Sequence, residues 1–271
     1  MKNYSILFSL LISSVALAQQ GIDGMVQSEL KFAAFALSNS TKEAFIKYAD
    51  SAGVIFENGE AINARSFWGK KEKRPGILRW RPRFAEIANS GDFGYTTGSW
   101  TFQPLTITDS IIAAGHFFTV WQLNKHGNWQ FLLDMGTSNA PIESTSSLEK
   151  ISLLTFSKLK AQDSSIIDVE YSFINTYNKS PQLAYKKYLS NRSILNREQM
   201  SFAILPTDKE ALLSTYTEPA KLTPLKSGLA TSGDLGYVYG VAEYKGKKGN
   251  YLHIWRHEKK GWKVALELIQ H

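Results

Sequence analysis

The stretch Ser90-Gly91-Asp92-Phe93-Gly94-Tyr95 decides how this chain is organised, because it returns later as Ser232-Gly233-Asp234-Leu235-Gly236-Tyr237. A further glycine follows at the same spacing in both places, Gly98 and Gly240. Ser, Gly and Asp favour tight turns, and the aromatic residues after them favour a strand. The motif therefore predicts a hairpin turn that leads into a strand, twice in one chain.

Other matches flank this motif in the same order. They comprise one helical segment upstream and two tryptophans downstream: 44–48 returns as 184–188, and Trp121 and Trp129 return as Trp255 and Trp262. The first copy has an extra segment around 104–113. Solenoid repeats run to about 20 to 50 residues, and this repeat is much longer. We therefore predict two copies of one globular domain.

Each copy predicts helices first and strands last. In the first copy, apolar residues at helical spacing predict a helix over 25–37, Ser40 or Thr41 caps a second helix, and Asn63 or Ser66 opens a short third one. Alternating residues and Gly- or Asn-containing turns then predict four strands, over 78–88, 93–102, 114–123 and 129–135.

The second copy repeats this pattern. Helices are predicted near 165–178, 181–190 and 207–214, and strands near 222–230, 235–244, 250–257 and 262–269. Short connections between the strands predict an antiparallel sheet with helices covering one face. The fold class is therefore α+β, with N-terminal helices packed on a sheet in each of two tandem domains.

The N-terminus has the pattern of a secretory signal peptide over 1–18. Lys2 supplies a positive charge, an apolar stretch follows from Ile6, and Ala16-Leu17-Ala18 has the small-x-small pattern of a cleavage site. The apolar stretch is shorter than the roughly 20 residues that span a bilayer, which argues against an anchor. We expect cleavage after Ala18 and export, to the periplasm or the outside of the cell, with no membrane attachment afterwards.

Composition limits the chemistry. The 271 residues include no cysteine, which excludes disulfides, thiol nucleophiles and cysteine-ligated metals. The formal net charge of +7 falls to +6 once Lys2 is removed, and this mild excess together with export argues against nucleic-acid binding. Ser, Thr and Pro-rich sequence between the copies predicts a linker over 137–160, which leaves domains at 19–136 and 161–271.

Two or three predicted helices precede the segment "Pro82 … Ser90-Gly91-Asp92-Phe93-Gly94-Tyr95-Thr96-Thr97-Gly98 … Val120-Trp121 … Gly127-Asn128-Trp129 … Asp134". This arrangement resembles the SnoaL-like branch of the nuclear transport factor 2-like superfamily. That superfamily also contains ketosteroid isomerase and scytalone dehydratase. The resemblance covers nearly all of 24–136 and 165–269. It implies a cone-shaped domain in each copy, whose curved sheet leaves a pocket at the open end.

In enzymes of this superfamily, a carboxylate or histidine transfers protons while a tyrosine or acid polarises a carbonyl. The resemblance implies three catalytic candidates, Asp50, Asp134 and His116. It also implies five ligand-binding candidates, Tyr48, Trp68, Tyr95, Tyr188 and Tyr237. In the second copy, the positions of the two acids become Ser190 and Glu267, and His116 aligns near Asn250. The first copy is therefore the better candidate for catalysis.

Structural roles compete with each of these assignments. Asp50 can accept backbone N–H bonds after a helix, Asp134 can end a strand, and His116 can be a packed histidine. His253 and His257 are four residues apart, which on a strand is roughly 13 Å and too far to share a metal. No phosphate loop or metal-binding motif is present, and we expect no cofactor and no metal.

Three hypotheses follow. The first is a module that binds a small apolar or carbonyl-bearing molecule in a cone pocket without catalysis. The second is a cofactor-free isomerase, dehydratase or cyclase that uses an acid or histidine of the first copy. The third is a protein-interaction module, because domains of this superfamily commonly pair through their sheets. In that case the two copies would form a monomeric pseudo-dimer within one chain.

Overall fold

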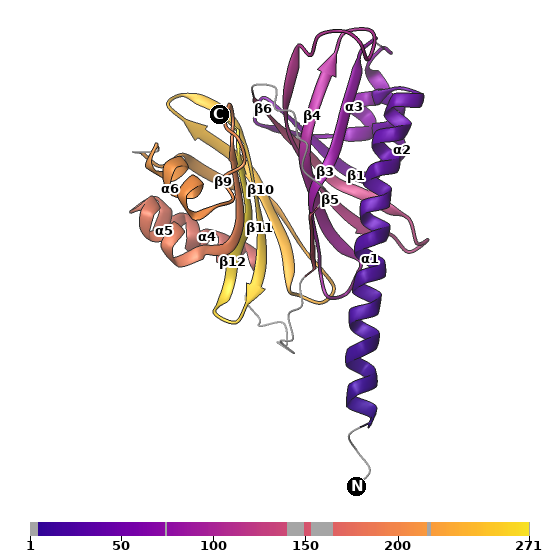
Figure 1. Cartoon of the computed structure of the whole chain (residues 1–271). Helices are drawn as coiled ribbons and strands as arrows, with labels where there is room; N and C mark the ends of the chain where they lie inside the picture. Colours follow the sequence, from indigo (N-terminus) through magenta and orange to yellow (C-terminus); the bar gives the residue numbers. More distant parts are fainter. Residues whose placement is uncertain (1–4, 74, 140–148, 153–164, 216–217, 271) are drawn as a thin grey trace. The chain divides into compact units, whose positions relative to one another are not determined.

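A computed structural model describes residues 5–73, 75–139, 149–152, 165–215 and 218–270 (Figure 1). Most of the predicted linker over 137–160 lies outside these residues. The chain divides into two compact units, which are described separately below. The first consists mainly of 1–55 and 62–156, and the second mainly of 157–229 and 233–271, with 56–61 grouped in the second and 230–232 in the first.

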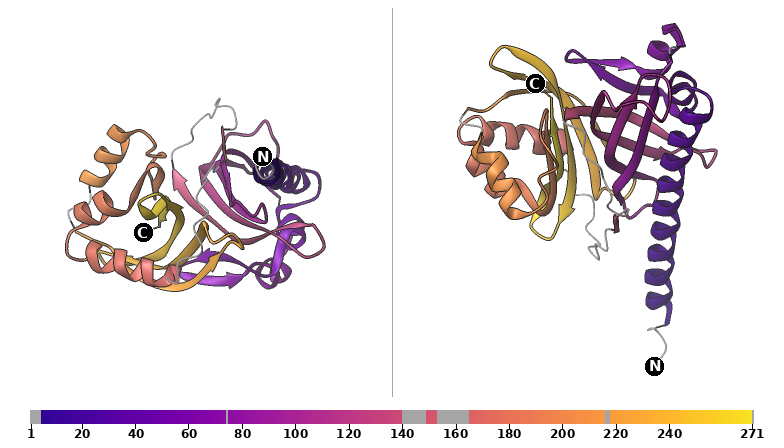
Figure 2. Two further views of the ribbon diagram at one scale, coloured as in Figure 1. Left: turned by 90° about the horizontal axis from the view of Figure 1, so that it is seen from below. Right: turned by 45° about the horizontal axis from the view of Figure 1, so that its top comes forward.

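The first unit contains helices that precede and interrupt its sheet. In chain order its elements are α1 (Ser5–Ser38), α2 (Thr41–Tyr48), β1 (Ala49–Glu57), β2 (Glu60–Asn63), α3 (Ala64–Lys70), β3 (Ile77–Ile87), β4 (Phe93–Gln103), β5 (Ala113–Leu123), β6 (Trp129–Asn139) and β7 (Glu149–Ser152). The strand order in the sheet is β2-β1-β6-β5-β4-β3-β7. The sheet curves around the C-terminal part of α1, and the N-terminal part of this helix extends beyond the sheet (Figure 1, Figure 2).

The second unit has the same plan with fewer strands. Its elements are α4 (Ile166–Tyr177), α5 (Pro181–Tyr188), β8 (Leu189–Arg197), α6 (Pro206–Ser214), β9 (Lys221–Leu229), β10 (Leu235–Tyr244), β11 (Lys247–Glu258) and β12 (Gly261–Ile269). The strand order is β8-β12-β11-β10-β9, which matches the order β1-β6-β5-β4-β3 of the first sheet. All three helices lie on one side of this sheet (Figure 2). The α+β fold class predicted from the sequence is confirmed.

Capping side chains mark several helix starts. Of the predicted caps, Ser40 accepts the backbone N–H of Glu43 at the start of α2 and Asn63 accepts that of Ser66 at the start of α3. Ser180, which was not predicted, accepts the backbone N–H of Leu183 at the start of α5. A side-chain oxygen at this position satisfies one of the N–H groups that a helix leaves unpaired. The first helix differs from the prediction over 25–37, because α1 begins at Ser5. No helix among the described residues combines the length and apolarity needed to cross a membrane.

Three of the described strands pair in parallel and were not predicted, β1 and β7 in the first sheet and β8 in the second. β1 runs parallel to β6, β7 to β3 and β8 to β12, while the predicted strands pair antiparallel with one another. β7 falls within the predicted linker over 137–160. β1 and β8 begin at the residue that follows a helix and lack clear alternation, so nothing separates them from the helix in the sequence. Each sheet is therefore mixed, with an antiparallel centre.

The repeated glycine motif has a packing reason as well as a turn. Gly91 and Gly233 have φ values of 72° and 70°, a conformation that side chains disfavour. A Cβ on Gly94 would lie 2.7 Å from Met25 Sδ of α1, and one on Gly236 would lie 2.5 Å from the Ile166 side chain of α4. The motif thus turns the chain and lets a helix approach the sheet closely.

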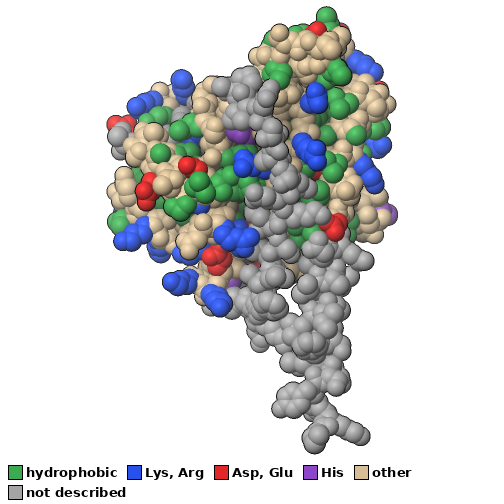
Figure 3. Space-filling model, in the orientation of Figure 1, with side chains coloured by type: hydrophobic (Ala, Val, Ile, Leu, Met, Phe, Trp, Pro, Cys, Tyr) green, Lys and Arg blue, Asp and Glu red, His purple; other side chains and the backbone are tan. Residues whose placement is uncertain are grey.

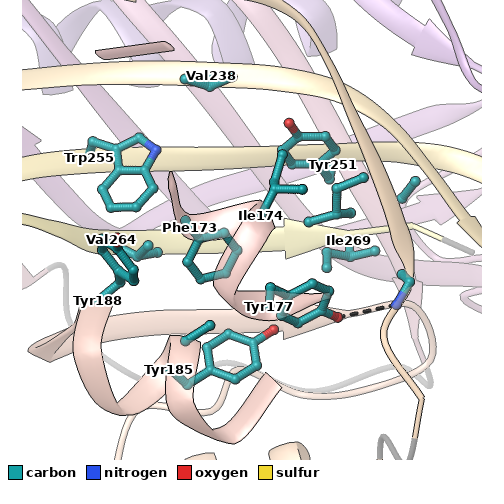
Figure 4. Close-up of a cluster of buried hydrophobic side chains, with 14 of the residues drawn as sticks. Phe173, Ile174, Tyr177, Tyr185, Tyr188, Val238, Tyr251, Trp255, Val264 and Ile269 are labelled. Atoms are coloured by element: carbon teal, nitrogen blue, oxygen red, sulfur yellow. Dashed lines mark hydrogen bonds between the residues drawn. The ribbon is translucent and has the colours of Figure 1, made fainter. Parts of the chain in front are cut away.

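Apolar side chains from the helices and the inner face of each sheet form the cores. In the second unit, Phe173 of α4 is fully buried and contacts rings from α5 and β11 (Figure 4). Tyr177 follows one turn later and accepts the backbone N–H of Ala220 at 3.3 Å. In the first unit, Phe32 of α1 takes the place of Phe173, against Phe45 and Phe131. The helix is therefore held on the sheet by aromatic packing.

Candidate functional site

A buried carboxylate of α1 faces the inner side of the first sheet. Glu29 is 0% exposed and accepts hydrogen bonds from Trp80 Nε1 at 2.6 Å, Thr96 Oγ1 at 2.5 Å and Trp121 Nε1 at 3.1 Å. These donors come from β3, β4 and β5, so the carboxylate ties the helix to three strands. Burying a carboxylate is costly unless it is hydrogen-bonded, and these three donors offset that cost.

A second carboxyl group lies beside it on β6. Asp134 pairs with Thr119 across the strands, and Thr119 Oγ1 donates to Asp134 Oδ2 at 2.7 Å. Thr119 lies two residues before Trp121 and therefore on the same face of β5. Asp134 is half-buried, and Thr119 is its hydrogen-bond partner among the described residues. The first unit thus holds two neighbouring carboxyl groups on its inner face.

The surroundings raise the pKa of both acids. Burial raises the pKa of Asp134 to about 8, against the hydrogen bond from Thr119, and the nearby charge of Glu29 raises it further. Burial also raises the pKa of Glu29, opposed by hydrogen bonds from Thr96, Trp80 and Trp121. No basic side chain of the described residues lies within ion-pair distance of either carboxyl group. A neutral Asp134 at pH 7 can donate a hydrogen bond as well as accept one.

The second unit has charged groups at the matching positions, but here they are paired. Glu170 of α4 accepts from Trp255 Nε1 at 2.7 Å and lies 3.0 Å from His253 Nδ1. The other ring nitrogen of His253 lies 2.6 Å from Glu267 Oε2. All three ionisable side chains are 0% exposed. His253 therefore bridges two carboxylates inside the unit.

Arg197 completes this network. Its guanidinium forms an ion pair with Glu267, and it donates to Tyr185 Oη at 3.0 Å. Tyr185 in turn donates to Glu267 at 3.0 Å. Burial by itself would lower the pKa of His253, but Glu170 and Glu267 raise it to about 9. Burial would raise the pKa of Glu267, but Arg197 and His253 lower it to about 2. Two cations thus balance two anions.

Asp50 occupies a turn. It begins the irregular part of β1, and its Oδ1 accepts the backbone N–H of Ala52 at 2.8 Å. Ser190 does the same in the second unit, where its hydroxyl accepts the backbone N–H of Arg192 at 3.1 Å. The two residues share a local structural role. The structure does not bring Asp50 into contact with Asp134.

His116 and Tyr95 lie on the other face of the first sheet. On β5, Thr119 and Trp121 point to the inner face, so His116 points to the other face. On β4, Thr96 points inward to Glu29, so its neighbour Tyr95 points outward, where it donates to Glu86 at 2.8 Å. His116 is buried, with Nδ1 2.5 Å from the Asn139 amide, and burial together with Arg83 lowers its pKa to about 4. The structure does not bring His116 or Tyr95 together with Asp134.

The remaining ligand-binding candidates lie in or behind the helical layers. Tyr48 packs on Phe32, with ring centroids 5.1 Å apart, and burial raises its pKa. Trp68 of α3 lines a cavity of about 410 Å³ next to α2, away from Asp134. Tyr188 is buried against Phe173 and Trp255 in the core of the second unit. Tyr237 matches Tyr95 and lies on the face of its sheet away from the helices.

Glu29 is not among the site residues predicted from the sequence. It falls on the apolar stripe of α1 that includes Met25, Phe32 and Ala36, at helical spacing. Glu170 falls on the corresponding stripe of α4, and both glutamates precede a core phenylalanine by three residues. An acid on an apolar stripe, repeated in both copies, is the signal that points to these positions. In the described part of the chain, no group of three His, Asp or Glu side chains is placed to hold a metal ion.

Solved structures of several proteins are similar to part of the chain. A putative ketosteroid isomerase from Parabacteroides distasonis is 15% identical, covers 41% of this chain and 86% of its own, and has a TM-score of 0.33. An NTF2-like protein from Cytophaga hutchinsonii is 16% identical, with coverages of 38% and 92% and a TM-score of 0.32. A ketosteroid isomerase-like protein from Erwinia carotovora is 12% identical, with coverages of 44% and 97% and a TM-score of 0.35. No family model matches the chain, and the search of curated proteins found no match.

Proposed function

We propose that the first unit binds a small apolar molecule that carries a carbonyl group, and that Asp134 donates a hydrogen bond to it. The observation that carries this proposal is the contrast between the units. The acids of the second unit are neutralised by His253 and Arg197, whereas Asp134 and Glu29 have hydroxyl and indole donors instead. Ionisable groups whose pKa is strongly shifted by burial occur preferentially at functional sites.

The direction of the hydrogen bonds supports a carbonyl ligand. Thr119 Oγ1 forms a hydrogen bond with Asp134 Oδ2, which leaves Oδ1 as the oxygen that faces no hydrogen-bond partner among the described residues. A proton on Oδ1 is available to a ligand. A carboxylic acid held neutral by apolar surroundings is an effective donor to a carbonyl oxygen. Phe131, Ile55 and Phe32 supply apolar side chains on the same side of the sheet. The ligand would gain burial for its apolar body and one strong hydrogen bond.

The test uses acetophenone labelled with ¹³C at the carbonyl. We expect the carbonyl resonance to move downfield on binding, because hydrogen-bond donation polarises the C=O bond. The shift should disappear in D134L and as the pH rises through about 8, where Asp134 ionises. D168N, an exposed acid of the second unit, is the matched control and should keep the shift. A shift that persists in D134L would refute the proposal.

Proton transfer is the second candidate function. With a pKa of about 8, Asp134 has both protonation states available near neutral pH, which suits a general acid or base in a cofactor-free isomerase, dehydratase or cyclase. Deuterium exchange at the methyl group of acetophenone in D₂O measures this directly. Exchange that is faster with the protein and lost in D134N would favour catalysis. Exchange at the solvent rate with a retained carbonyl shift would leave binding as the function.

We also propose that the two units arose by duplication and that the protein is exported after cleavage behind Ala18. The repeated motif, the shared strand order and the matching acids support duplication. N-terminal sequencing of the secreted or periplasmic protein tests the cleavage site. The interaction-module hypothesis predicts a monomer in solution, since the two copies would pair within the chain. Light scattering of the mature protein distinguishes that monomer from a dimer.

A further inference from the structure

A separate cavity lies in the second unit, outside the inner face of its sheet. Its volume is about 680 Å³, and it is bordered by α5, the start of β8 and α6. Apolar walls come from two prolines and two leucines: Pro181, Leu189, Pro206 and Leu213. A cavity of this size is in the range of small-molecule sites. None of its lining residues belongs to the acid pair of the first unit, so it is independent of the function proposed above.

Lys209 of α6 lines this cavity and is buried. Lys209 is 8% exposed, which is unusual for a lysine. Its ammonium has one hydrogen-bond partner among the described residues, the backbone carbonyl of Asn191 at 3.3 Å. An ammonium group has three N–H donors, so most of its hydrogen-bonding capacity is unused. The remaining donors are available to water or to an anion in the cavity, and an anion would also offset the positive charge.

The protein does not supply that anion. No carboxylate of the described residues lies within ion-pair distance of Lys209. Its neighbours Asp208 and Glu210 are exposed on α6, and Lys186 is exposed on α5. Burial lowers the pKa of Lys209, and Asp208 opposes this only in part. A bound anion would restore the missing partner.

We propose that this cavity binds a small carboxylate with an apolar body, and that Lys209 Nζ binds the carboxylate. One buried ammonium matches one negative charge, whereas a phosphate would bring a second charge close to Glu210, which also lines the cavity. The prolines and leucines suit an alkyl or aryl body. Ser190 and Asn191 lie beside Lys209 in the lining and limit the apolar surface at that end.

The experiment is calorimetric titration of the full mature chain with octanoate and, as a neutral analogue, octan-1-ol. K209M keeps the length of the side chain and removes its charge. K186M removes an exposed lysine from the rim of the same cavity and is the matched control. Charged hydrogen bonds contribute about 1.5 to 3 kcal/mol, so K209M should weaken octanoate binding at least about 10-fold. Octan-1-ol should bind K209M and the unchanged chain equally.

A second variant locates the site. S214W places a large ring at an exposed position of the cavity rim and should abolish binding of both probes. Circular dichroism checks that each variant folds, and K209Q replaces K209M if the latter does not. Three results would overturn the proposal: no saturable binding of octanoate to the unchanged chain, equal affinity in the Lys209 variants, or an equal loss in K186M.

Discussion

Asp134 and Glu267 occupy the same place in the two sheets, each on the last antiparallel strand. Asp134 faces Thr119, and Glu267 faces His253. Burial raises the pKa of Asp134 to about 8, because the hydrogen bond from Thr119 opposes this effect only in part. Burial would also raise the pKa of Glu267, but the charges of Arg197 and His253 lower it to about 2. The presence of two cations in the second unit thus separates a structural ion network from the candidate site of the first.

Replacing Asp134 by asparagine should stabilise the protein at neutral and alkaline pH. Because the folded pKa of Asp134 lies above its unfolded value near 3.8, the folded state binds the proton more tightly, and the free energy of unfolding falls as the pH rises from about 4 to 8. D134N removes this loss. We expect a gain of about 1 kcal/mol or more at pH 8. Urea unfolding of both proteins at pH 5 and pH 8 measures the difference, and equal gains at both values would contradict the assignment.

Replacing Glu29 by glutamine should lower the pKa of Asp134 and destabilise the first unit. The neighbouring charge that raises the pKa of Asp134 disappears. The amide NH₂ of glutamine replaces one carboxylate oxygen, so it meets the indole donor of Trp80, which bonds Oε1, or that of Trp121, which bonds Oε2, and the lost hydrogen bond costs about 1 to 3 kcal/mol. Carboxyl ¹³C NMR and thermal unfolding measure the two effects. E43Q, on the exposed side of α2, should change neither.

Removing His253 should strongly destabilise the second unit. H253Q leaves the charges of Glu170 and Glu267 buried without the cation between them, and breaking a buried ion pair in this way costs about 3 to 5 kcal/mol. Calorimetry should show an unfolding transition at lower temperature. H126N replaces an exposed histidine in a turn and should stay within about 0.5 kcal/mol of the unchanged chain. Similar losses in the two variants would show that the network is not stabilising.

The second unit should lose stability in alkaline solution. The folded pKa of His253, about 9, lies above its ordinary value of 6.5, so its contribution is complete below pH 6.5 and is lost as the pH rises through about 9. Unfolding temperatures measured from pH 6 to pH 10 should fall over that window. The slope should be absent in H253Q. A fall of equal steepness in that variant would assign the effect to other groups.

Asp50 should prove structural. D50A removes the acceptor for the Ala52 N–H and should cost about 0.5 to 1 kcal/mol of stability. Because Asp50 does not contact Asp134, the carbonyl shift of bound acetophenone should be unchanged. The test is the same titration that defines the proposed site. If D50A abolished that shift, Asp50 would have to be part of the ligand site.

The candidate site was only partly predictable from the sequence. Asp134 is a candidate from the sequence because it is an acid on the last predicted strand of the first copy. Glu29 was missed, since an acid in a helix is ordinarily read as a surface residue. His116 and Asp134 were grouped together, but strand alternation places them on opposite faces of the sheet. The residue types indicated which chemistry is available, whereas the sheet face on which each residue lies and the register of the strand pairs decided which side chains come together.

The sequence by itself determined the repeated plan of helices followed by strands, because turn glycines, capping serines and alternating residues act over a few neighbouring positions. The parallel strands β1 and β8, the closeness of Glu29 to Asp134, and the burial of Lys209 were decided only by the tertiary structure. Each depends on residues far apart in the chain. The pKa values of Glu29, Asp134 and Lys209 also depend on the tertiary structure, since desolvation and charge pairing arise only when distant segments enclose a side chain together.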